Sequence, residues 1–504
     1  MLTEIKKVIR QDLKLKYLLI AGLLVQLLFS ITATGFYHTD QHFQVIEFSS
    51  HQSGEPNSMS VLWESENPVR STVQVYMFTA WHWLINTIGI HNSFLELTLL
   101  RIILGLLMFA VFSIIAMHYF KNEQKIILYS VLLLLNFSWF LPYTKTLFSS
   151  EMLSSLFFFG SVCWYDYFKD KKPGISFLLL IGFLLSLAFY FRFQTGFFLA
   201  GFGIWMLIKQ KNIYHYLYLA AGFIIGFLLN TWLDHGFYGQ WVFTPYEYFY
   251  TNIIDKRAAS FGTSSFLRYV GLLIAIVPVP PLSILLFFYA IKSFFKKYDR
   301  LIFLTALLFI IGHSLVGHKE ERFMFPVLCV MPILIGWGLP GLIKFYSNTK
   351  KVIRLILKTL IIFSAGLNFL LLILLLLNPY SQTVHFTALL KKYIKKHEGT
   401  TRIYSIIRTP FETESITPVV FYRKDFKNLE FIKITKDEAD HLNDSAIYLT
   451  STFEQVVDKK KLLDSLGYKP VLYSSSLLWK INEILYSRKI LTINDIWVLY
   501  KKEK

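Results

Sequence analysis

The sequence predicts an all-α polytopic membrane protein that is followed by a small C-terminal soluble α/β domain. Hydrophobic residues make up 54% of the 504 positions and charged residues only 17%, whereas a soluble surface requires far more charge. Apolar runs of about 20 residues, each long enough to cross a hydrocarbon core as a helix, recur up to about residue 378. From about Thr400 they give way to short β-branched and aromatic runs, which are typical of strands.

About eleven runs qualify as membrane spans. The first follows a basic start and lacks a small-residue cleavage site, so we expect it to be retained. With the N-terminus placed in the cytoplasm, every cytoplasmic gap between spans is basic, as the positive-inside rule requires. The expected spans are residues 17–36, 95–119, 126–143, 147–165, 175–191, 194–208, 213–233, 266–293, 301–316, 323–345 and 352–378.

This pattern divides the chain into a transmembrane domain, residues 1–380, and a soluble non-cytoplasmic domain, residues 381–504. The transmembrane domain carries two long outer loops, residues 37–94 and 234–265. Within the first loop, residues 73–90 form an amphipathic aromatic stretch that is expected to lie in the membrane interface. The strands expected in the soluble domain are residues 402–407, 419–423, 430–435, 446–450 and 496–500.

The distribution of charges, cysteines and motifs along the sequence disfavours several functions. The net charge of +18 is concentrated in short gaps between spans, which indicates membrane topology rather than a nucleic-acid partner. Cys163 and Cys329 lie inside apolar runs, so neither a disulfide nor a thiolate metal site is expected. No phosphate-binding glycine loop is present, and no carboxylate and histidine cluster dictates a metal. We therefore predict no metal and no other cofactor.

Polar side chains gather at the outer ends of the spans, where they cost free energy unless they are paired or hydrated. Asp40 follows the first span and could take the proton of an acceptor hydroxyl. Arg192, His318, Lys319 and Arg322 could hold a lipid phosphate, which leaves without a proton and needs only cations. Simpler interpretations stay open. Asp40 could be a solvated residue or a helix cap, and Arg192 could only extend to the membrane interface. The HKEER run could be a solvated hairpin between two spans.

These residues also resemble a known family. The segment HKEERFMFP at residues 318–326 resembles the signature of mannosyltransferases that use dolichyl-phosphate mannose in glycosylphosphatidylinositol-anchor and N-glycan precursor assembly. Residues 234–252, DHGFYGQWVFTPYEYFYTN, resemble a loop of that family, as do TKTLFSSEM at 144–152 and the first outer loop. The resemblance covers about residues 15–345 and is strongest to the third mannosyltransferase of anchor assembly.

The resemblance implies a C-type glycosyltransferase fold and a set of site residues. It gives Asp40 the role of base, and since Gln41 stands where many relatives have a second acidic residue, any role for a carboxylate pair passes to Glu47. Lys145 replaces an arginine of the relatives. The donor phosphate is assigned to Arg192, His318, Lys319 and Arg322, and other substrate contacts to Trp63, Glu64, Arg70, Glu151, Asp234, Tyr238, Trp241 and Glu320.

The function expected from this resemblance is inverting transfer of a single sugar, mannose by preference. The sugar would pass from a polyprenyl-phosphate carrier to a glycan or glycolipid acceptor at the outer membrane face. The Lys, Ile, Phe and Asn bias favours a bacterial cytoplasmic membrane over the endoplasmic reticulum. Two alternatives are a polytopic lipid or glycan transporter, whose charges should lie near mid-bilayer, and an oligosaccharide ligase of related fold, whose product grows by more than one sugar.

Overall fold

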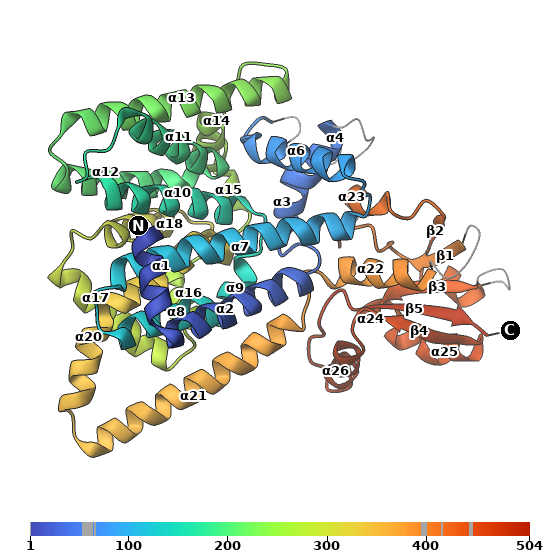
Figure 1. Ribbon diagram of the computed structural model, residues 1–504. Helices are drawn as coiled ribbons and strands as arrows, with labels where there is room; N and C mark the ends of the chain where they lie inside the picture. The colour runs from blue at the N-terminus through green and yellow to red at the C-terminus, as the bar shows by residue number, and fades with distance from the viewer. Residues whose placement is uncertain are drawn as a thin grey trace. The chain divides into compact units, whose positions relative to one another are not determined.

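Helices form most of the computed structural model (Figure 1), which describes residues 2–52, 64, 67–394, 401–414, 417–442 and 447–503. The chain packs into two compact units. Unit 1 consists of Met1–Ile31, Trp63–Met77 and Leu100–Leu377. Unit 2 consists of Thr32–Leu62, Phe78–Leu99 and Asn378–Lys504. The C-terminal residues thus pack together with two segments from early in the chain.

Four helices in the described part of the chain are long and apolar enough to cross a membrane: α2 (Leu13–Thr32), α7 (Ser93–Phe120), α13 (Ile213–Tyr238) and α21 (Lys351–Leu376). Two bent pairs raise the number to six if each pair is one span. The first pair joins α17 (Leu282–Lys296) to α18 (Leu301–Leu315) at 114°, and the second joins residues 321–328 to α20 (Met331–Asn348) at 58°. The chain is a membrane protein with several apolar helices.

Shorter helices complete unit 1 where the sequence predicted single spans. The expected span at 175–191 is the helix α11 (Ile175–Phe191), and that at 194–208 is α12 (Gly196–Lys209). The remaining helices described for this unit are α1 (Leu2–Gln11), α8 (Lys125–Phe137), α9 (Leu141–Thr144), α10 (Ser150–Phe168), η2 (Phe193–Thr195), α14 (Thr244–Phe249), η3 (Tyr250–Ile254), α15 (Arg257–Ser260), α16 (Arg268–Ile276), η4 (Glu321–Met324) and α19 (Phe325–Leu328).

Proline breaks one of the expected spans. Residues 266–293 form α16 and α17 instead of one helix, and the gap between them holds Pro278, Pro280 and Pro281. Proline has no N–H to donate and its ring clashes with the preceding turn, so the helix ends before this cluster and restarts after it. Residues 323–345 are interrupted in a similar way, by η4 and α19 before α20 begins.

Glycines allow α11 and α13 to pack backbone against backbone. A Cβ atom added to Gly222 would lie 2.0 Å from the carbonyl oxygen of Leu179, and one added to Gly182 would lie 2.1 Å from that of Leu219. Small residues permit this kind of close approach between helices in membranes. The two helices therefore depend on Gly182 and Gly222 for their separation.

We expect Gly222→Ala to destabilise the protein by about 1–3 kcal/mol, because the added methyl group forces two backbones apart. The measurement is the midpoint of thermal unfolding in detergent. Gly203→Ala in α12 is the matched control, since no atom lies within 4 Å of its added Cβ and alanine is the better helix former. Equal midpoints for Gly222→Ala and wild type would contradict the close-packing argument.

Unit 2 contains a five-stranded sheet in the order β2-β1-β3-β5-β4. β1 (Thr401–Ile406) runs parallel to β2 (Leu429–Ile434) and β3 (Tyr448–Thr452), whereas β5 (Trp497–Lys502) is antiparallel to β3 and to β4 (Tyr468–Tyr473). The helices of this unit are α3 (Thr39–His42), η1 (Phe43–Glu47), α4 (Phe48–Gln52), α22 (Gln382–Ile394), α23 (Val420–Arg423), η5 (Glu438–His441), α24 (Phe453–Val456), η6 (Val457–Lys459), α25 (Lys460–Ser465) and α26 (Ser476–Ser487). α6 (Val73–Thr87) and α7 each contribute residues to both units.

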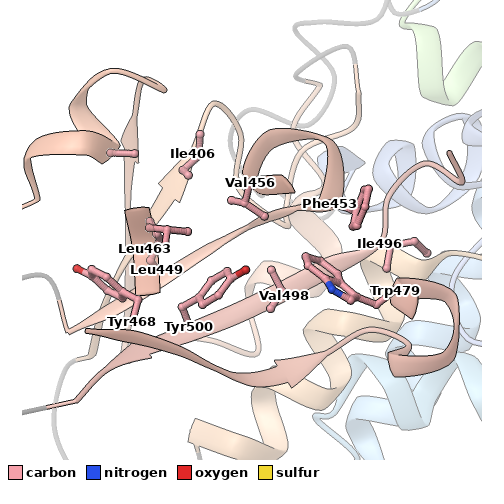
Figure 2. Packing of buried hydrophobic residues seen from close by; sticks show 11 residues of the cluster. Ile406, Leu449, Phe453, Val456, Leu463, Tyr468, Trp479, Ile496, Val498 and Tyr500 are labelled. Carbon is pink, nitrogen blue, oxygen red and sulfur yellow. The ribbon is translucent and has the colours of Figure 1, made fainter. Parts of the chain in front are cut away.

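Both faces of the sheet are covered by helices. On one face, Leu449, Val498 and Tyr500 pack with Phe453 of α24 and Trp479 of α26 (Figure 2). On the other, the buried side chains are those of Phe386 and Leu390 from α22 with Ile403, Trp497 and Leu499 from the sheet. This is the α/β arrangement that the sequence predicted for the C-terminal residues.

Two strand predictions were wrong. Residues 419–423 are not a strand but contain the short helix α23, and β4 was missed. β4 carries Pro470, which weakens the sequence signal for a strand, but proline is tolerated there because β4 is an edge strand with only β5 beside it. The reason for α23 lies in the contacts of Glu47 described below.

Candidate functional site

Arg192 lies at the end of α11, where the chain turns into η2, and its side chain is 5% exposed. Its Nη1 atom donates to Oε1 of Glu151 at 2.6 Å. The Nε and Nη2 atoms are buried and have no hydrogen-bond partner among the residues that the structure describes. An unpaired buried donor costs about 1–3 kcal/mol, and more when the group is charged. Two such donors on one arginine therefore indicate a site that is complete only when an anion or another acceptor binds.

Glu151 holds Arg192 in place. It begins α10, which Ser149 caps through its hydroxyl, and only 2% of its side chain is exposed. Nη1 of Arg322 lies 3.9 Å from the same Oε1 atom that Arg192 contacts. Charged groups inside a membrane protein are expensive and are usually retained for function. Glu151 thus lies between the two guanidinium groups and holds them at one side of the site.

Glu320 links the other end of this cluster. Its Oε2 atom accepts from Nε of Arg322 at 2.5 Å, and its Oε1 atom lies 2.9 Å from Nε2 of His318. Nδ1 of His318 lies 3.1 Å from the carbonyl oxygen of Gly262. Both partners of the imidazole are acceptors, so both contacts are hydrogen bonds only when both ring nitrogens carry protons. In that form His318 adds a third cation to Arg192 and Arg322.

Phe323 supplies the surface on which the two arginines rest. The Cζ atom of Arg192 lies 4.7 Å from the centre of its ring, and that of Arg322 lies 5.4 Å from it. Guanidinium groups at these distances are attracted to the face of an aromatic ring. Phe323 lies in the HKEERFMFP segment but was not predicted as a site residue, because an aromatic residue at the start of a span resembles a core residue.

The side chain of Lys319 forms its hydrogen bonds outside this cluster. Its Nζ atom donates to the carbonyl oxygens of Val316 at 2.5 Å and Ser264 at 3.2 Å. Burial, together with the nearby charge of Arg268, lowers the pKa of Lys319 below its ordinary value. These contacts tie the loop before η4 to the segment before α16. They use two of the three N–H groups of Lys319, and its phosphate contact stays a prediction.

The first outer loop contributes an ion pair to unit 1. Nε and Nη2 of Arg70 lie 3.1 and 3.0 Å from Oε1 of Glu64, which is buried. The guanidinium group lies 5.4 Å from the ring centre of Tyr248, whose hydroxyl accepts from the side chain of Gln194. Gln194 is two residues beyond Arg192, so the Glu64–Arg70 pair is connected to that turn. The expected substrate contact Trp63 lies outside the described residues.

The middle outer loop is held by Asp234, a residue expected to contact substrate. Its Oδ1 atom accepts from the backbone N–H and the hydroxyl of Thr72, both at 2.7 Å, and Oδ2 accepts from Thr244 at 2.6 Å. Asp234 is fully buried, so it clamps chain segments instead of meeting a substrate. The Tyr238 hydroxyl donates to the carbonyl oxygen of Arg70 at 2.8 Å. Trp241 is 69% exposed and stacks on His235 at 4.1 Å.

Asp40 lies in unit 2, in the first turn of α3. Its backbone N–H donates to Nδ1 of His38 at 3.2 Å, which caps the helix. About a third of the Asp40 side chain is exposed, with Oδ1 3.8 Å from Nδ1 of His38. A carboxylate in this position is reachable from outside, as a general base must be.

Glu47 was expected to share a catalytic role with Asp40, and its surroundings contradict that expectation. Its side chain is completely buried, and Oε1 accepts from the backbone N–H groups of Val420 at 2.9 Å and Phe421 at 3.1 Å. The same oxygen lies 2.8 Å from Nε2 of His42, whose ring stacks on Tyr422. A carboxylate at a helix start stabilises the helix by accepting its free N–H groups. Glu47 therefore forms α23 and is sealed from any substrate.

Five of the expected site residues come together in unit 1: Arg192, Glu151, Arg322, Glu320 and His318. Asp40 belongs to the other unit. Within the described residues, no group of three or more His, Cys, Asp or Glu side chains is placed to hold a metal ion.

Comparison with known sequences identifies relatives. GPI mannosyltransferase 3 of Debaryomyces hansenii is 24% identical over 328 residues, which cover 62% of this chain and 58% of the relative. GPI mannosyltransferase 3 of Candida albicans is 31% identical over 144 residues, or 28% of each chain. A probable Dol-P-Man:Man(7)GlcNAc(2)-PP-Dol alpha-1,6-mannosyltransferase of Schizosaccharomyces pombe is 33% identical over 94 residues, or 18% of this chain and 16% of the relative. The chain thus spans less than three fifths of these curated relatives.

Solved structures show the same fold. ArnT from Cupriavidus metallidurans bound to undecaprenyl phosphate superposes with a TM-score of 0.54 at 12% identity, covering 96% of this chain and 97% of ArnT. The architecture is therefore the C-type glycosyltransferase fold that the sequence resemblance implied. The model of the Alg9-like mannosyltransferase family matches residues 17–415, which include the whole cluster around Arg192. The chain belongs to the Alg9-like mannosyltransferase family.

Proposed function

We propose that this protein is an inverting glycosyltransferase that moves one mannose from a polyprenyl-phosphate carrier to a hydroxyl of a glycan or glycolipid acceptor. The observation that supports it best is the buried Arg192 with two unpaired donors, Nε and Nη2, beside Arg322. An arginine presents planar paired donors that match a phosphate group. The membership of the Alg9-like family supports mannose as the sugar.

The proposed reaction is a single displacement at the anomeric carbon. A general base accepts the proton of the acceptor hydroxyl, whose oxygen forms the new bond to the anomeric carbon. The bond from that carbon to the phosphate oxygen breaks, and the phosphate keeps the electron pair. Arg192, Arg322 and the imidazolium form of His318 balance the negative charge that develops on this leaving group. One displacement inverts the configuration at the anomeric carbon.

The supply of substrate supports a lipid carrier. The basic gaps between spans favour a site at the non-cytoplasmic face, where nucleotide sugars are absent. A polyprenyl-phosphate sugar reaches such a site through the bilayer. ArnT, which shares the fold, was solved with undecaprenyl phosphate. We propose undecaprenyl phosphate as the carrier and the bacterial inner membrane, with an outward-facing site, as the location.

The test is transfer by the purified full-length chain. The protein is incubated with undecaprenyl-phosphate mannose, the corresponding glucose and galactose donors, or GDP-mannose, together with a lipid extract as acceptor source. We expect polyprenyl phosphate to be released from the mannose donor and a product to gain the mass of one hexose. Use of GDP-mannose, gain of several sugars at once, or movement of donor between leaflets without bond cleavage would each overturn the proposal.

Arg192→Lys should raise the KM for the lipid donor by about 10- to 100-fold, because each hydrogen bond to a charged group contributes about 1.5–3 kcal/mol. Lysine preserves the charge that faces Glu151 but loses the planar fork. Arg354→Lys is the matched control, since the Nε atom of that exposed arginine donates to the Thr349 carbonyl oxygen, in the chain between α20 and α21. Steady-state kinetics with a labelled donor provide the measurement. An unchanged KM would remove Arg192 from the phosphate site.

A further inference from the structure

His313 is a buried polar residue that the site described so far does not use. It lies in the last turn of α18, its exposed fraction is 3%, and its ring centre lies 4.0 Å from that of Phe309, with the rings tilted by 37°. Nδ1 lies 3.0 Å from the carbonyl oxygen of Phe309, so this nitrogen carries the proton in the neutral ring. Nε2 is buried without any hydrogen-bond partner. The lone pair of that nitrogen lacks a donor.

Tyr269, beside His313, is a second buried polar residue that the site described so far does not use. This residue of α16 is completely buried, and its ring centre lies 6.4 Å from that of His313. Its hydroxyl proton has no acceptor. Tyrosine hydroxyls that are buried in a protein usually find a hydrogen-bond partner. Tyr269 is thus a neighbour of His313.

Arg192 and His313 both lie beside Phe323. The Arg192 guanidinium lies 4.7 Å from the ring centre of Phe323, and the His313 ring lies 6.2 Å from it. Among the described residues, Nε and Nη2 of Arg192 and Nε2 of His313 have no hydrogen-bond partner, and the hydroxyl proton of Tyr269 has no acceptor. Native proteins contain few such atoms, and each requires an explanation. A shared ligand explains all four at once.

The chemistry of these atoms selects the ligand. Arg192 offers only donors, Tyr269 offers a donor, and His313 in its neutral form offers an acceptor. The ligand must therefore combine an anionic acceptor with a hydroxyl group that can donate. A phosphate next to a sugar ring has both, whereas a bare phosphate dianion has no proton for His313.

We propose that His313 and Tyr269 hold the sugar of the lipid donor, and that His313 Nε2 accepts a hydrogen bond from one sugar hydroxyl. This inference rests on the proposed function, since it assigns the sugar to the residues beside the Arg192 phosphate site. His313 and Tyr269 then decide which sugar is accepted, and Arg192 recognises the carrier. A site that hydrogen-bonds a hydroxyl rejects analogues that lack it, because its own polar groups remain unpaired.

The experiment compares His313→Phe and Tyr269→Phe with wild type in the full chain. Two quantities are measured: the KM for undecaprenyl-phosphate mannose, and the inhibition constant of sugar-free undecaprenyl phosphate. We expect each variant to raise the KM at least tenfold and to leave the inhibition constant within twofold of wild type. Arg192→Lys, in contrast, should raise both. Tyr165→Phe is the matched control, because Tyr165 is also buried but its hydroxyl already pairs with His215.

Donors that lack single hydroxyls sharpen the assignment. Wild type should discriminate against each deoxy-mannosyl donor, and His313→Phe should lose its discrimination at one position while keeping it at the others. Thermal unfolding separates folding from recognition: His313→Phe should be at least as stable as wild type, because a buried unpaired atom is removed.

Wild-type KM values in both variants, or an equal loss of sugar-free carrier binding, would overturn this inference and leave the proposed function standing. If wild type released carrier from no sugar donor, the proposed function itself would fail. The two failures are therefore distinguishable. If water alone occupied the site, both variants would have unchanged KM values. That result would count against the inference.

Discussion

Asp40→Asn is expected to lower kcat by about 10²- to 10⁴-fold, the usual contribution of a general base. Asparagine has the same shape as aspartate but cannot take the acceptor proton. The local fold should survive, since the contact that begins α3 runs from the backbone N–H of residue 40 to His38 and not from its side chain. Binding of the lipid donor should therefore stay unchanged.

Single-turnover and steady-state rates with the lipid donor give kcat, and equilibrium binding of the same donor gives its affinity. Asp255→Asn is the control, because Asp255 is an exposed carboxylate in the loop between α14 and α16. Full turnover by Asp40→Asn would take the role of base away from Asp40. Loss of donor binding in the same proportion would mean that Asp40 positions substrate instead.

Glu47→Ala should destabilise unit 2 by about 3–5 kcal/mol, the cost of removing one partner from a buried charged contact. The alanine leaves the N–H groups of Val420 and Phe421 without an acceptor, and it leaves His42 without its carboxylate. Hydrogen exchange at the N–H groups of Val420 and Phe421 and the midpoint of thermal unfolding are the two measurements. We expect fast exchange at both sites and a lower midpoint.

Glu47→Gln distinguishes a structural from a catalytic carboxylate. Its amide oxygen can still accept from both N–H groups, so the variant should recover most of the lost stability and most of the turnover. A catalytic carboxylate would behave in the opposite way, with normal stability and no turnover in Glu47→Gln. Glu430→Ala, which removes an exposed partner of Arg402, serves as the surface control.

The helical part of the fold could be predicted because hydrophobic length is a local property. Residues 175–191, for example, were expected as a span and form α11 without shift. α23 could not be predicted in this way, because Val420 and Phe421 owe their helical conformation to Glu47, a residue 373 and 374 positions away. A run of β-branched and aromatic residues favours a strand until such a distant acceptor overrides it.

The candidate site was predictable to the extent that its residues are adjacent in sequence. His318, Glu320 and Arg322 belong to one short signature, and the structure confirms that they contact one another. Asp234 looked like a substrate residue because nothing local reveals that Thr72 and Thr244 saturate its oxygens. His313 was missed for the converse reason, since a histidine inside an apolar run resembles an ordinary core residue.

The composition of unit 2 has a consequence for the timing of synthesis. Its three segments begin at Thr32, Phe78 and Asn378, and the acceptors and donors that join them include Glu47 with Val420 and Ser93 with Asp425. A ribosome releases the Asp40 segment long before it makes the partners that order that segment. Newly made chains therefore insert their first helices into the bilayer while this unit is still incomplete, and its early segments find their partners only after the third segment is synthesised.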